Sequence, residues 1–330
     1  MDIKTETDCD LSLIRARQVA ILGYGNQGRA QALNLRDSGV EQIIIGSRGG
    51  TETAHQAGKD GFAIFPFSKA VLNADVIMVL LPDEVQGEVY EKEIAPNLKA
   101  GVALGFSHGF SIHFGRIKPR PGIDVFLAAP KGPGKALRAL FTDGLGMPCV
   151  IGVYQDASGR AHELALSYAA ALGAGRAGIL ESSFKEECET DLFSEQAILC
   201  GGLPALIKAG YELLVEKGYS PEVAYIECLH EVKQIADLMW QGGLDFKNKS
   251  ISNTAEFGGY QAGDRIVNHK VRAEMQSILE DIRLGKFADL FEADRKNEFR
   301  ELKSRRAKDA EHEIEVSGKK VRALMPWLKN

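Results

Sequence analysis

Short apolar segments rich in β-branched residues alternate with longer segments of helical periodicity through the first half of the chain. Each apolar segment is followed by glycine, proline or a polar turn, as expected for strands that are buried on both faces of a sheet. This alternation is typical of a doubly wound α/β fold, in which helices cover both faces of a parallel sheet. The strands are expected at residues 18–22, 41–45, 75–81, 101–106, 124–129 and 148–153.

The strand pattern stops near Gly178, and segments with helical periodicity then continue to the end of the chain. One long helix has a well-defined predicted start, because Ser220 is a favoured N-cap residue and Pro221 suits the first helical turn. A chain of 330 residues also exceeds the size that a single hydrophobic core usually reaches. We therefore predict an α/β domain at residues 1–182 and an all-helical domain at residues 183–330.

Charge and cysteine usage narrow the class of protein. The net charge is −5 at pH 7, and no basic cluster points to nucleic acid or an anionic membrane as a partner. The longest apolar run, residues 75–82, is too short to cross a bilayer, and the first ten residues lack the features of a secretory signal. The five cysteines are scattered and form no C-x-x-C pair. We expect a cytoplasmic protein with reduced thiols.

A glycine-rich stretch, "VAILGYGNQGRAQALNL", joins the first predicted strand to a helix. Its three glycines have the G-x-G-x-x-G spacing of a dinucleotide-binding loop, in which they allow a tight turn, backbone approach to a pyrophosphate and close packing of helix on strand. The helix N-terminus would offer unpaired N–H groups to the phosphates. The candidate cofactor-binding residues in this loop are Gly23, Tyr24, Gly25, Gln27 and Gly28.

The end of the second predicted strand bears on the choice between NAD and NADP. An NAD enzyme usually has an acid there for the ribose hydroxyls, whereas this chain has "IIIGSRGGTET". Arg48, Thr51 and Thr53 could bind a 2′-phosphate, which favours NADP. Glu52 has the opposite tendency because its carboxylate could accept hydrogen bonds from free ribose hydroxyls. An ordinary surface role for Arg48 is the alternative.

Two further loops follow predicted strands, at the edge of the sheet where doubly wound folds bind ligands. "GFSHGFSIHFG" contains His108, and "AAPKGPG" contains Lys131 and Gly134. Loop histidines and lysines are usually solvated, and we expect this of His113. The proline and glycines around Lys131 instead indicate a rigid, shaped loop. We predict that His108 and Lys131 are catalytic and that Gly134 contacts the cofactor.

Acidic residues interrupt apolar faces in two predicted helices. In "FKEECETDLFSEQAILCGG", Asp191 and Glu195 share a face with apolar residues, and in "SPEVAYIECLHEV", Glu227 and Glu231 do the same. Buried unpaired carboxylates are costly, so these acids must be protonated, paired or bound to metal. Four carboxylate groups suit Mg²⁺, whereas a solvated acidic face is the alternative. That alternative describes two neighbouring acids better, Glu186 and Glu189.

Together with "SHGFSIHF", "APKGPG" and "SISNTAEFG", these motifs make the chain resemble the ketol-acid reductoisomerases of the short class, nearly from end to end. The resemblance implies an N-terminal Rossmann domain, a knotted all-helical C-terminal domain and active sites shared within a homodimer or larger homo-oligomer. It implies NADPH and two Mg²⁺ as cofactors. The implied reaction converts 2-acetolactate or 2-aceto-2-hydroxybutyrate to a 2,3-dihydroxy-3-methyl acid in valine and isoleucine biosynthesis.

The resemblance also implies roles for individual residues. Asp191 and Glu195 would bind Mg²⁺, and Glu227 and Glu231 of the partner subunit would complete the two-metal site. Ser252 would contact the substrate carboxylate. His108 and Lys131 would lie near the reacting carbons.

Four positions depart from the usual pattern of the family. Arg29, Gln31 and Lys135 stand where members commonly have histidine, and Ser194 replaces a common glycine. These departures leave room for a diverged paralogue that acts on a related acetohydroxy acid. The competing hypotheses are a plain NADP-dependent hydroxy-acid dehydrogenase and a non-catalytic nucleotide-sensing oligomer. Mg²⁺-dependent isomerisation would separate the first from the other two.

Overall fold

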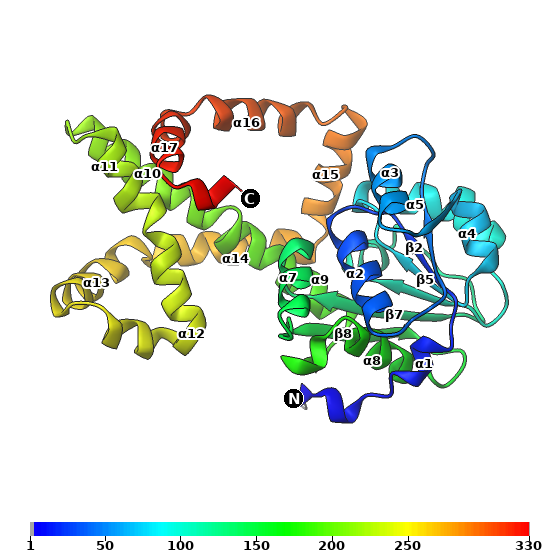
Figure 1. The fold of residues 1–330 in the computed structure, drawn as a ribbon. Helices are drawn as coiled ribbons and strands as arrows, with labels where there is room; N and C mark the ends of the chain where they lie inside the picture. Colours follow the sequence, from blue (N-terminus) through cyan, green and yellow to red (C-terminus); the bar gives the residue numbers. More distant parts are fainter. Residues whose placement is uncertain (1–2, 330) are drawn as a thin grey trace. The chain divides into compact units, whose positions relative to one another are not determined.

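A computed structural model describes residues 3–329 of the chain, which divides into two compact units at residues 1–190 and 191–330 (Figure 1). The division lies inside one continuous helix, α9 (Phe184–Ser194). The predicted domain boundary after residue 182 lies just before this helix and stays a prediction, because α9 takes part in both units.

The first unit is built around one nine-stranded sheet with the strand order β1-β9-β8-β7-β6-β5-β2-β3-β4. Neighbouring strands from β7 through β4 pair in parallel, as predicted. The bounds are β1 Ile3–Lys4, β2 Val19–Leu22, β3 Ile43–Gly46, β4 Ala63–Phe65, β5 Val76–Val79, β6 Ala103–Phe106, β7 Asp124–Pro130, β8 Cys149–Gln155 and β9 Ile179–Glu181.

The expectation of a wholly parallel sheet is wrong at one end. β8 runs antiparallel to β7, with Cys149 opposite Pro130, and β1 runs antiparallel to β9. Along β8 buried residues are interrupted by partly exposed ones, which is typical of an antiparallel strand near the edge of a sheet. Its apolar residues therefore predicted a strand but not its direction.

Three strands are absent from the sequence-based prediction. β1, β4 and β9 contain only two or three residues each, which is too short for a recognisable alternation. β9 also corrects the expectation that strands end near Gly178. These segments are strands because they pair with longer neighbours.

Helices cover both faces of the sheet and place alternate strand residues in two separate cores. Ile21 and Ile45 pack on the face covered by α2 (Asn26–Asp37) and α8 (Ala161–Ala171), whereas Leu22 and Ile44 pack on the face covered by α4 (Phe67–Asn73). All four side chains are nearly inaccessible to solvent. The remaining helices of this unit are α1 Ser12–Arg15, α3 Glu52–Lys59, α5 Asp83–Val89, α6 Phe110–His113 and α7 Gly134–Thr142.

The second unit is all-helical, as predicted, and contains two π-helical turns. These turns are η5 (Glu195–Leu199), directly after α9, and η6 (Ile226–His230), between α11 and α12. The helices are α10 Gly202–Glu216, α11 Pro221–Tyr225, α12 Val232–Ser250, α13 Asn253–Ile266, α14 His269–Arg283, α15 Lys286–Lys296, α16 Arg300–Glu311 and α17 Glu313–Ala323. The knot implied by the resemblance stays a prediction.

The long helix predicted from Pro221 begins there but is not regular. The π-helical turn interrupts it, and Gly243 breaks α12 with a φ of 79°. Ser220 occupies the N-cap position without a capping hydrogen bond, since its hydroxyl bonds the Glu222 carboxylate at 3.2 Å. Helical periodicity therefore predicted the segment but not these two irregularities.

Much apolar surface of the second unit is exposed within a single chain. Its buried cluster is small and centres on Tyr211 and Tyr225. Leu206, Leu213 and Trp240 are each more than half exposed, at 53%, 55% and 83%. One continuous stretch, Phe184–Glu216, is long and apolar enough by composition to span a membrane, with 6% of its most apolar window buried. The stretch therefore presents apolar surface that this chain alone does not cover.

Candidate functional site

The glycine-rich loop between β2 and α2 has the geometry that its motif predicts. Gly23 has a φ of +96°, and a Cβ there would lie 2.7 Å from the Leu80 carbonyl oxygen. A Cβ on Gly28 would lie 2.0 Å from the Gly23 carbonyl oxygen, so any larger residue would push the helix off the strand. Gly25 is exposed, and a Cβ there would have no neighbour within 4 Å. The loop is therefore tight on its protein side and open on the side where a phosphate would bind.

A pocket of about 480 Å³ lies beside this loop. Its size is within the range of small-molecule sites. Of the predicted cofactor residues, Tyr24, Gly25, Thr53 and Gly134 line it, whereas Gly23, Gln27, Gly28, Arg48 and Thr51 are not in its wall. The other lining residues are Asn26, Arg29, Ala30, Leu33, Glu52, Gln56, Lys135 and Arg138.

Thr51 has a local structural role at the start of α3. Its hydroxyl accepts a hydrogen bond from the Ala54 N–H at 3.2 Å and donates one to the Arg48 carbonyl oxygen at 3.2 Å. Glu52 is the first residue of the helix and faces the pocket. The loop thus presents a carboxylate to the pocket, while the Thr51 hydroxyl is engaged in capping.

The ionised carboxylate of Asp60 fixes three side chains that line the pocket. Asp60 accepts hydrogen bonds from Arg29 Nε at 2.7 Å, from the Tyr24 hydroxyl at 2.9 Å and from Gln56 Nε2 at 3.0 Å. The hydrogen bond from Arg29, aided by those from Tyr24 and Gln56, outweighs burial and lowers the pKa of Asp60 to about 2. Burial and the bond to Asp60 raise the pKa of Tyr24. Asp60 therefore fixes Tyr24 as a neutral phenol beside the pocket.

Replacing Asp60 by Asn should destabilise the protein at neutral pH. Because the folded-state pKa of Asp60 is depressed, its stabilisation is present above the unfolded pKa of about 4 and is lost as pH falls towards about 2. Arg29 is half exposed, so solvent screening reduces the effect to about 1 kcal/mol. Urea unfolding at pH 7 and pH 3 measures the difference between wild type and Asp60→Asn. A difference that grows on acidification would contradict this account.

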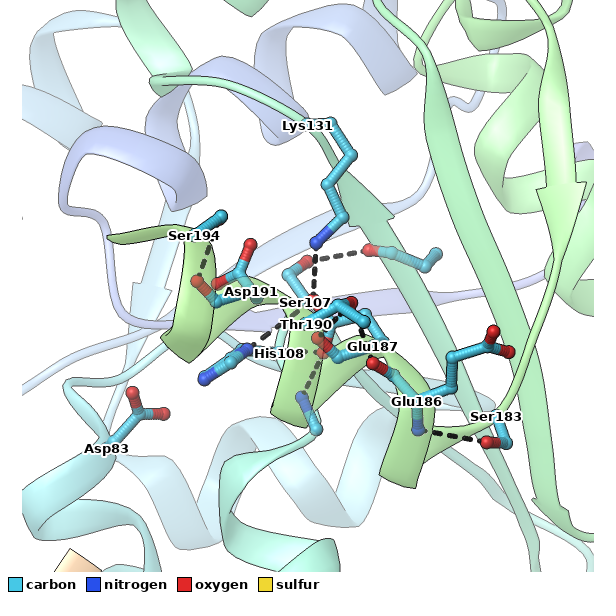
Figure 2. Close-up of polar contacts among 12 residues, drawn as sticks. Asp83, Ser107, His108, Lys131, Ser183, Glu186, Glu187, Thr190, Asp191 and Ser194 are labelled. Atoms are coloured by element: carbon cyan, nitrogen blue, oxygen red, sulfur yellow. Dashed lines mark hydrogen bonds and ion pairs between the residues drawn. The ribbon is translucent and has the colours of Figure 1, made fainter. Parts of the chain in front are cut away.

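The second cluster of polar residues centres on Glu187, which is 2% exposed. Its carboxylate accepts hydrogen bonds from Lys131 Nζ at 2.7 Å and from the Gly109 N–H at 2.7 Å. His108 Nδ1 lies 3.2 Å from the same carboxylate. Figure 2 shows Lys131 and His108 converging on Glu187 from separate loops. The structure thus brings together the two residues that the sequence analysis predicted to be catalytic.

The sheet explains why these residues meet. His108 follows β6 and Lys131 follows β7, and these adjacent strands are parallel, so their carboxyl ends lie at the same edge. Gly109 lets α9 approach closely, because a Cβ there would lie 2.2 Å from the Phe184 carbonyl oxygen. Glu187, on the first turns of α9, therefore reaches both loops.

Electrostatics keep the buried Glu187 ionised. Burial alone would raise the pKa of Glu187, but the hydrogen bond and charge of His108 and the charge of Lys131 together outweigh it, so this pKa is lowered. A buried carboxylate with several donors and a cationic partner is the arrangement in which such a group persists.

Sequence reasoning missed Glu187 and misplaced two neighbours. Glu187 stands four residues before Asp191, so the i, i+4 spacing that singled out Asp191 and Glu195 would have included it. Glu189 was expected in solvent, yet its side chain is 14% exposed and lies 3.3 Å from His113 Nε2. His113, also expected to be solvated, is only 15% exposed, and burial lowers its pKa. Glu186 is exposed, as expected.

Asp191 lies one turn beyond Glu187 on the continuous helix α9. His108, Glu187 and Asp191 offer potential metal-ligand atoms that all lie within 4.8 Å of one another. Both Glu187 oxygens already accept hydrogen bonds from protein donors. Asp191 is partly buried and carries the carboxylate that a cation beside this cluster would engage.

The other predicted metal ligands share a local feature. Glu195 begins the π-helical turn η5, whereas Glu227 lies within η6 and Glu231 directly follows it. π-Helical turns inside α-helices occur frequently at functional sites. Glu195, Glu227 and Glu231 are exposed within this chain, which corrects the expectation that they face an apolar interior. This chain alone does not cover these three acids.

Ser252, the predicted substrate-binding residue, is the N-cap of α13. Its hydroxyl oxygen accepts a hydrogen bond from the Ala255 N–H at 3.1 Å. This bond fixes the position of the hydroxyl and leaves its hydrogen to be donated outward. The role of Ser252 towards substrate stays a prediction.

Two family descriptions match nearly the whole chain. Residues 13–178 match "Acetohydroxy acid isomeroreductase, NADPH-binding domain", and residues 184–327 match "Ketol-acid reductoisomerase, C-terminal domain". Among solved structures, an NADH-preferring ketol-acid reductoisomerase from an uncultured archean is 44% identical, with a TM-score of 0.96, over 99% of this chain and 100% of its own.

More distant structures share the fold alone. A putative oxidoreductase from Jannaschia sp. CCS1 has a TM-score of 0.63 at 17% identity, and the match covers 84% of this chain and 98% of the other. A pyrroline-5-carboxylate reductase from Coxiella burnetii has a TM-score of 0.56 at 14% identity, covering 80% and 96% respectively.

Proposed function

Because this chain belongs to the ketol-acid reductoisomerase family, the nicotinamide-dependent enzymes of branched-chain amino acid biosynthesis, we propose how its own residues carry out the reaction. The substrates are 2-acetolactate and 2-aceto-2-hydroxybutyrate, and the product is the 2,3-dihydroxy-3-methyl acid. The observation that supports this site best is the buried Glu187 carboxylate, which holds Lys131 and His108 beside Asp191.

We propose that Asp191 and Glu195 bind two Mg²⁺ together with Glu227 and Glu231 of the partner subunit. The donor set fits, since four carboxylates suit a hard divalent cation, and Asp191 adjoins a cluster of other potential ligands. When bound, the metal ions polarise the substrate carbonyl and lower the pKa of the substrate hydroxyl, which favours migration of the alkyl group. The four carboxylates would hold the metal ions next to that pair of substrate oxygens.

Lys131 and His108 supply fixed polar groups next to the reacting carbons. Lys131 is held by Glu187 at 2.7 Å, so its ammonium group is oriented before substrate binds and can stabilise negative charge on a substrate oxygen. His108 Nδ1 lies 3.2 Å from the Glu187 carboxylate, which orients the imidazole ring beside the proposed substrate site. Ser252 would donate its hydroxyl hydrogen to the substrate carboxylate.

The nicotinamide cofactor would occupy the pocket beside the glycine-rich loop and supply hydride for the second step. The sequence favoured NADPH on the basis of Arg48, Thr51 and Thr53. In the structure Glu52 lines the pocket, Thr51 caps α3 and Arg48 is outside the pocket wall. A carboxylate there repels a 2′-phosphate and accepts from ribose hydroxyls. We propose NADH as the preferred cofactor, in line with the NADH preference of the 44% identical archaeal ketol-acid reductoisomerase.

The exposed apolar surface of the second unit supports a homodimer. Leu206, Leu213 and Trp240 are largely exposed, and a second copy of the chain would bury them and bring its own Glu227 and Glu231 to the site. A second copy of the chain would also cover the apolar stretch Phe184–Glu216, so this stretch requires no membrane to cover it. A cytoplasmic location is proposed because all five cysteines are free thiols.

The proposal is tested by following nicotinamide oxidation with each acetohydroxy acid, with and without Mg²⁺. Turnover should require Mg²⁺ and yield the rearranged dihydroxy acid. We expect kcat/KM with NADH to exceed that with NADPH by about tenfold, since a like charge facing the 2′-phosphate costs about 1.4 kcal/mol or more. Reduction without rearrangement would instead identify a plain hydroxy-acid dehydrogenase, and tight cofactor binding without turnover a nucleotide sensor.

Glu52→Gln is the matched variant for the cofactor choice, because it removes the charge and keeps the shape. The ratio of kcat/KM values should move towards NADPH, while kcat with saturating NADH stays close to wild type. A wild-type preference for NADPH that the substitution leaves unchanged would restore the assignment based on Arg48, Thr51 and Thr53.

A further inference from the structure

Gln31, on α2, lies at the centre of a buried hydrogen-bond network in the first unit. Its side chain is 0% exposed. Its amide oxygen accepts from the Tyr168 hydroxyl at 2.7 Å, and its amide nitrogen donates to Gln27 Oε1 at 3.1 Å and to Ser107 Oγ at 2.9 Å. Both N–H donors and the carbonyl of Gln31 are therefore used.

The network continues from Gln31 in two directions, and each branch ends at a backbone carbonyl. Gln27 Nε2 donates to the Gly132 carbonyl oxygen at 2.9 Å. Ser107 Oγ donates to the Ala128 carbonyl oxygen at 2.9 Å. Because a carbonyl only accepts, the orientations of Gln27, Ser107 and Gln31 are all determined.

Tyr168, which donates the first hydrogen bond of the network, is also fixed in its role as a donor. Tyr168 is 0% exposed, and burial raises its pKa well above the ordinary value, so it remains a phenol that can donate. A buried network with every member satisfied is rigid. The network therefore connects α8, in the interior of the unit, with the loops at the edge of the sheet.

Each branch contains a residue that is adjacent in the chain to a residue of the proposed site. Ser107 precedes His108 in the chain, and Gly132 follows Lys131. Gln27 itself belongs to the glycine-rich loop, and the adjacent Asn26 accepts a hydrogen bond from the Lys135 N–H at 3.0 Å. The cofactor loop and the two loops that carry His108 and Lys131 are thus joined through one amide.

We propose that Gln31 is a positioning residue, which sets the glycine-rich loop, His108 and Lys131 in mutual register for hydride transfer and alkyl migration. This inference rests on the proposed roles of His108 and Lys131. Gln31 contacts neither of them directly and acts through Gln27 and Ser107. Displacement of reacting groups by about 1 Å costs up to about a hundredfold in rate, so a network that prevents it has a measurable effect.

Gln31→Met removes the amide while keeping an unbranched side chain of similar length. We expect kcat to fall about tenfold, whereas KM for the acetohydroxy acid stays within about threefold, because positioning affects the reacting geometry more than substrate binding. Tyr168→Phe, which removes only the donor of the first bond, should lower kcat by about threefold. Gln31→His should retain most of the wild-type kcat, since a neutral imidazole can accept from Tyr168 and donate to Ser107.

Ser167→Ala is the matched control for Tyr168→Phe. Ser167 is also 0% exposed and adjacent on α8, but its hydroxyl bonds the Asp10 carbonyl oxygen and the Ile14 N–H, away from the site. It should lower the melting temperature without lowering kcat. If Ser167→Ala lowers kcat as much as Tyr168→Phe does, or if Gln31→Met has the kcat of wild type, the positioning role is overturned.

Hydrogen exchange separates this inference from the proposed function. Gln31→Met should accelerate exchange at residues 107–110 and 131–134, and Ser167→Ala should not. That result supports the positioning role even where wild type turns over neither acetohydroxy acid, an outcome that overturns the proposed function alone. Exchange that is unchanged in Gln31→Met overturns the positioning role.

Discussion

Asp191→Asn is expected to lower the rate of acetohydroxy acid conversion by about a thousandfold or more, because metal ions supply several kcal/mol of transition-state stabilisation and each 1.4 kcal/mol is about tenfold in rate. Asp191 is partly buried, and its carboxylate lies within 4.8 Å of the potential ligand atoms of Glu187 and His108. A neutral amide is a weaker ligand for Mg²⁺. Steady-state kinetics across a range of Mg²⁺ concentrations measure the effect.

The affinity for the nicotinamide cofactor should change little in this variant, since the cofactor pocket is lined by residues between Tyr24 and Arg138. Glu186→Gln is the matched control, because Glu186 is an exposed acid on the same helix and its carboxylate accepts a hydrogen bond from the Ser182 hydroxyl. It should leave kcat unchanged. Normal Mg²⁺-dependent activity in Asp191→Asn would refute the metal assignment.

Lys131→Met should abolish most activity and also destabilise the protein by about 3–5 kcal/mol, because it removes the cationic partner of a buried carboxylate. Glu187 is 2% exposed and would retain only His108 and the Gly109 N–H as partners. Its pKa would rise as a result. Urea denaturation measures the loss of stability, and single-turnover kinetics measure the loss of rate.

A second substitution distinguishes the two effects of Lys131→Met. Adding Glu187→Gln removes the buried charge and retains an oxygen for the Gly109 N–H, so the double variant should recover stability without recovering activity. Were the double variant less stable than Lys131→Met, Glu187 would not be the source of the destabilisation.

The centre of the first unit could be predicted from sequence because its strands are buried on both faces and are therefore continuously apolar. The glycine-rich loop was equally predictable, since Gly23 and Gly28 are required by contacts within a few residues of the motif. The short strands β1, β4 and β9 depend on pairing with distant segments, and the direction of β8 depends on how α7 and the following turn return the chain. Neither the pairing of the short strands nor the direction of β8 is encoded in a local sequence pattern.

In the site, too, some residues could be predicted from a local sequence pattern and others could not. His108 and Lys131 could be predicted because they follow strands, where ligands bind in this fold class. The i, i+4 spacing to Asp191 could have singled out Glu187, but the burial of Glu187 could not be predicted, because it results from the close approach of α9 to Gly109. The position of Gln31 was noticed only as a departure from the family, since a network of four side chains and two backbone carbonyls exists only in three dimensions.

The proposed metal site depends on the number of residues in the two π-helical turns of the helical unit. Each turn contains one residue more than a regular α-helical turn would use, and each lies at a proposed pair of metal ligands. Loss of one residue from either turn would restore a regular helix there and remove the wider turn that sets the direction of the neighbouring carboxylate side chains. Insertions and deletions are therefore the changes that this metal site should tolerate least, and redesign of its helices has to conserve the residue count through both turns.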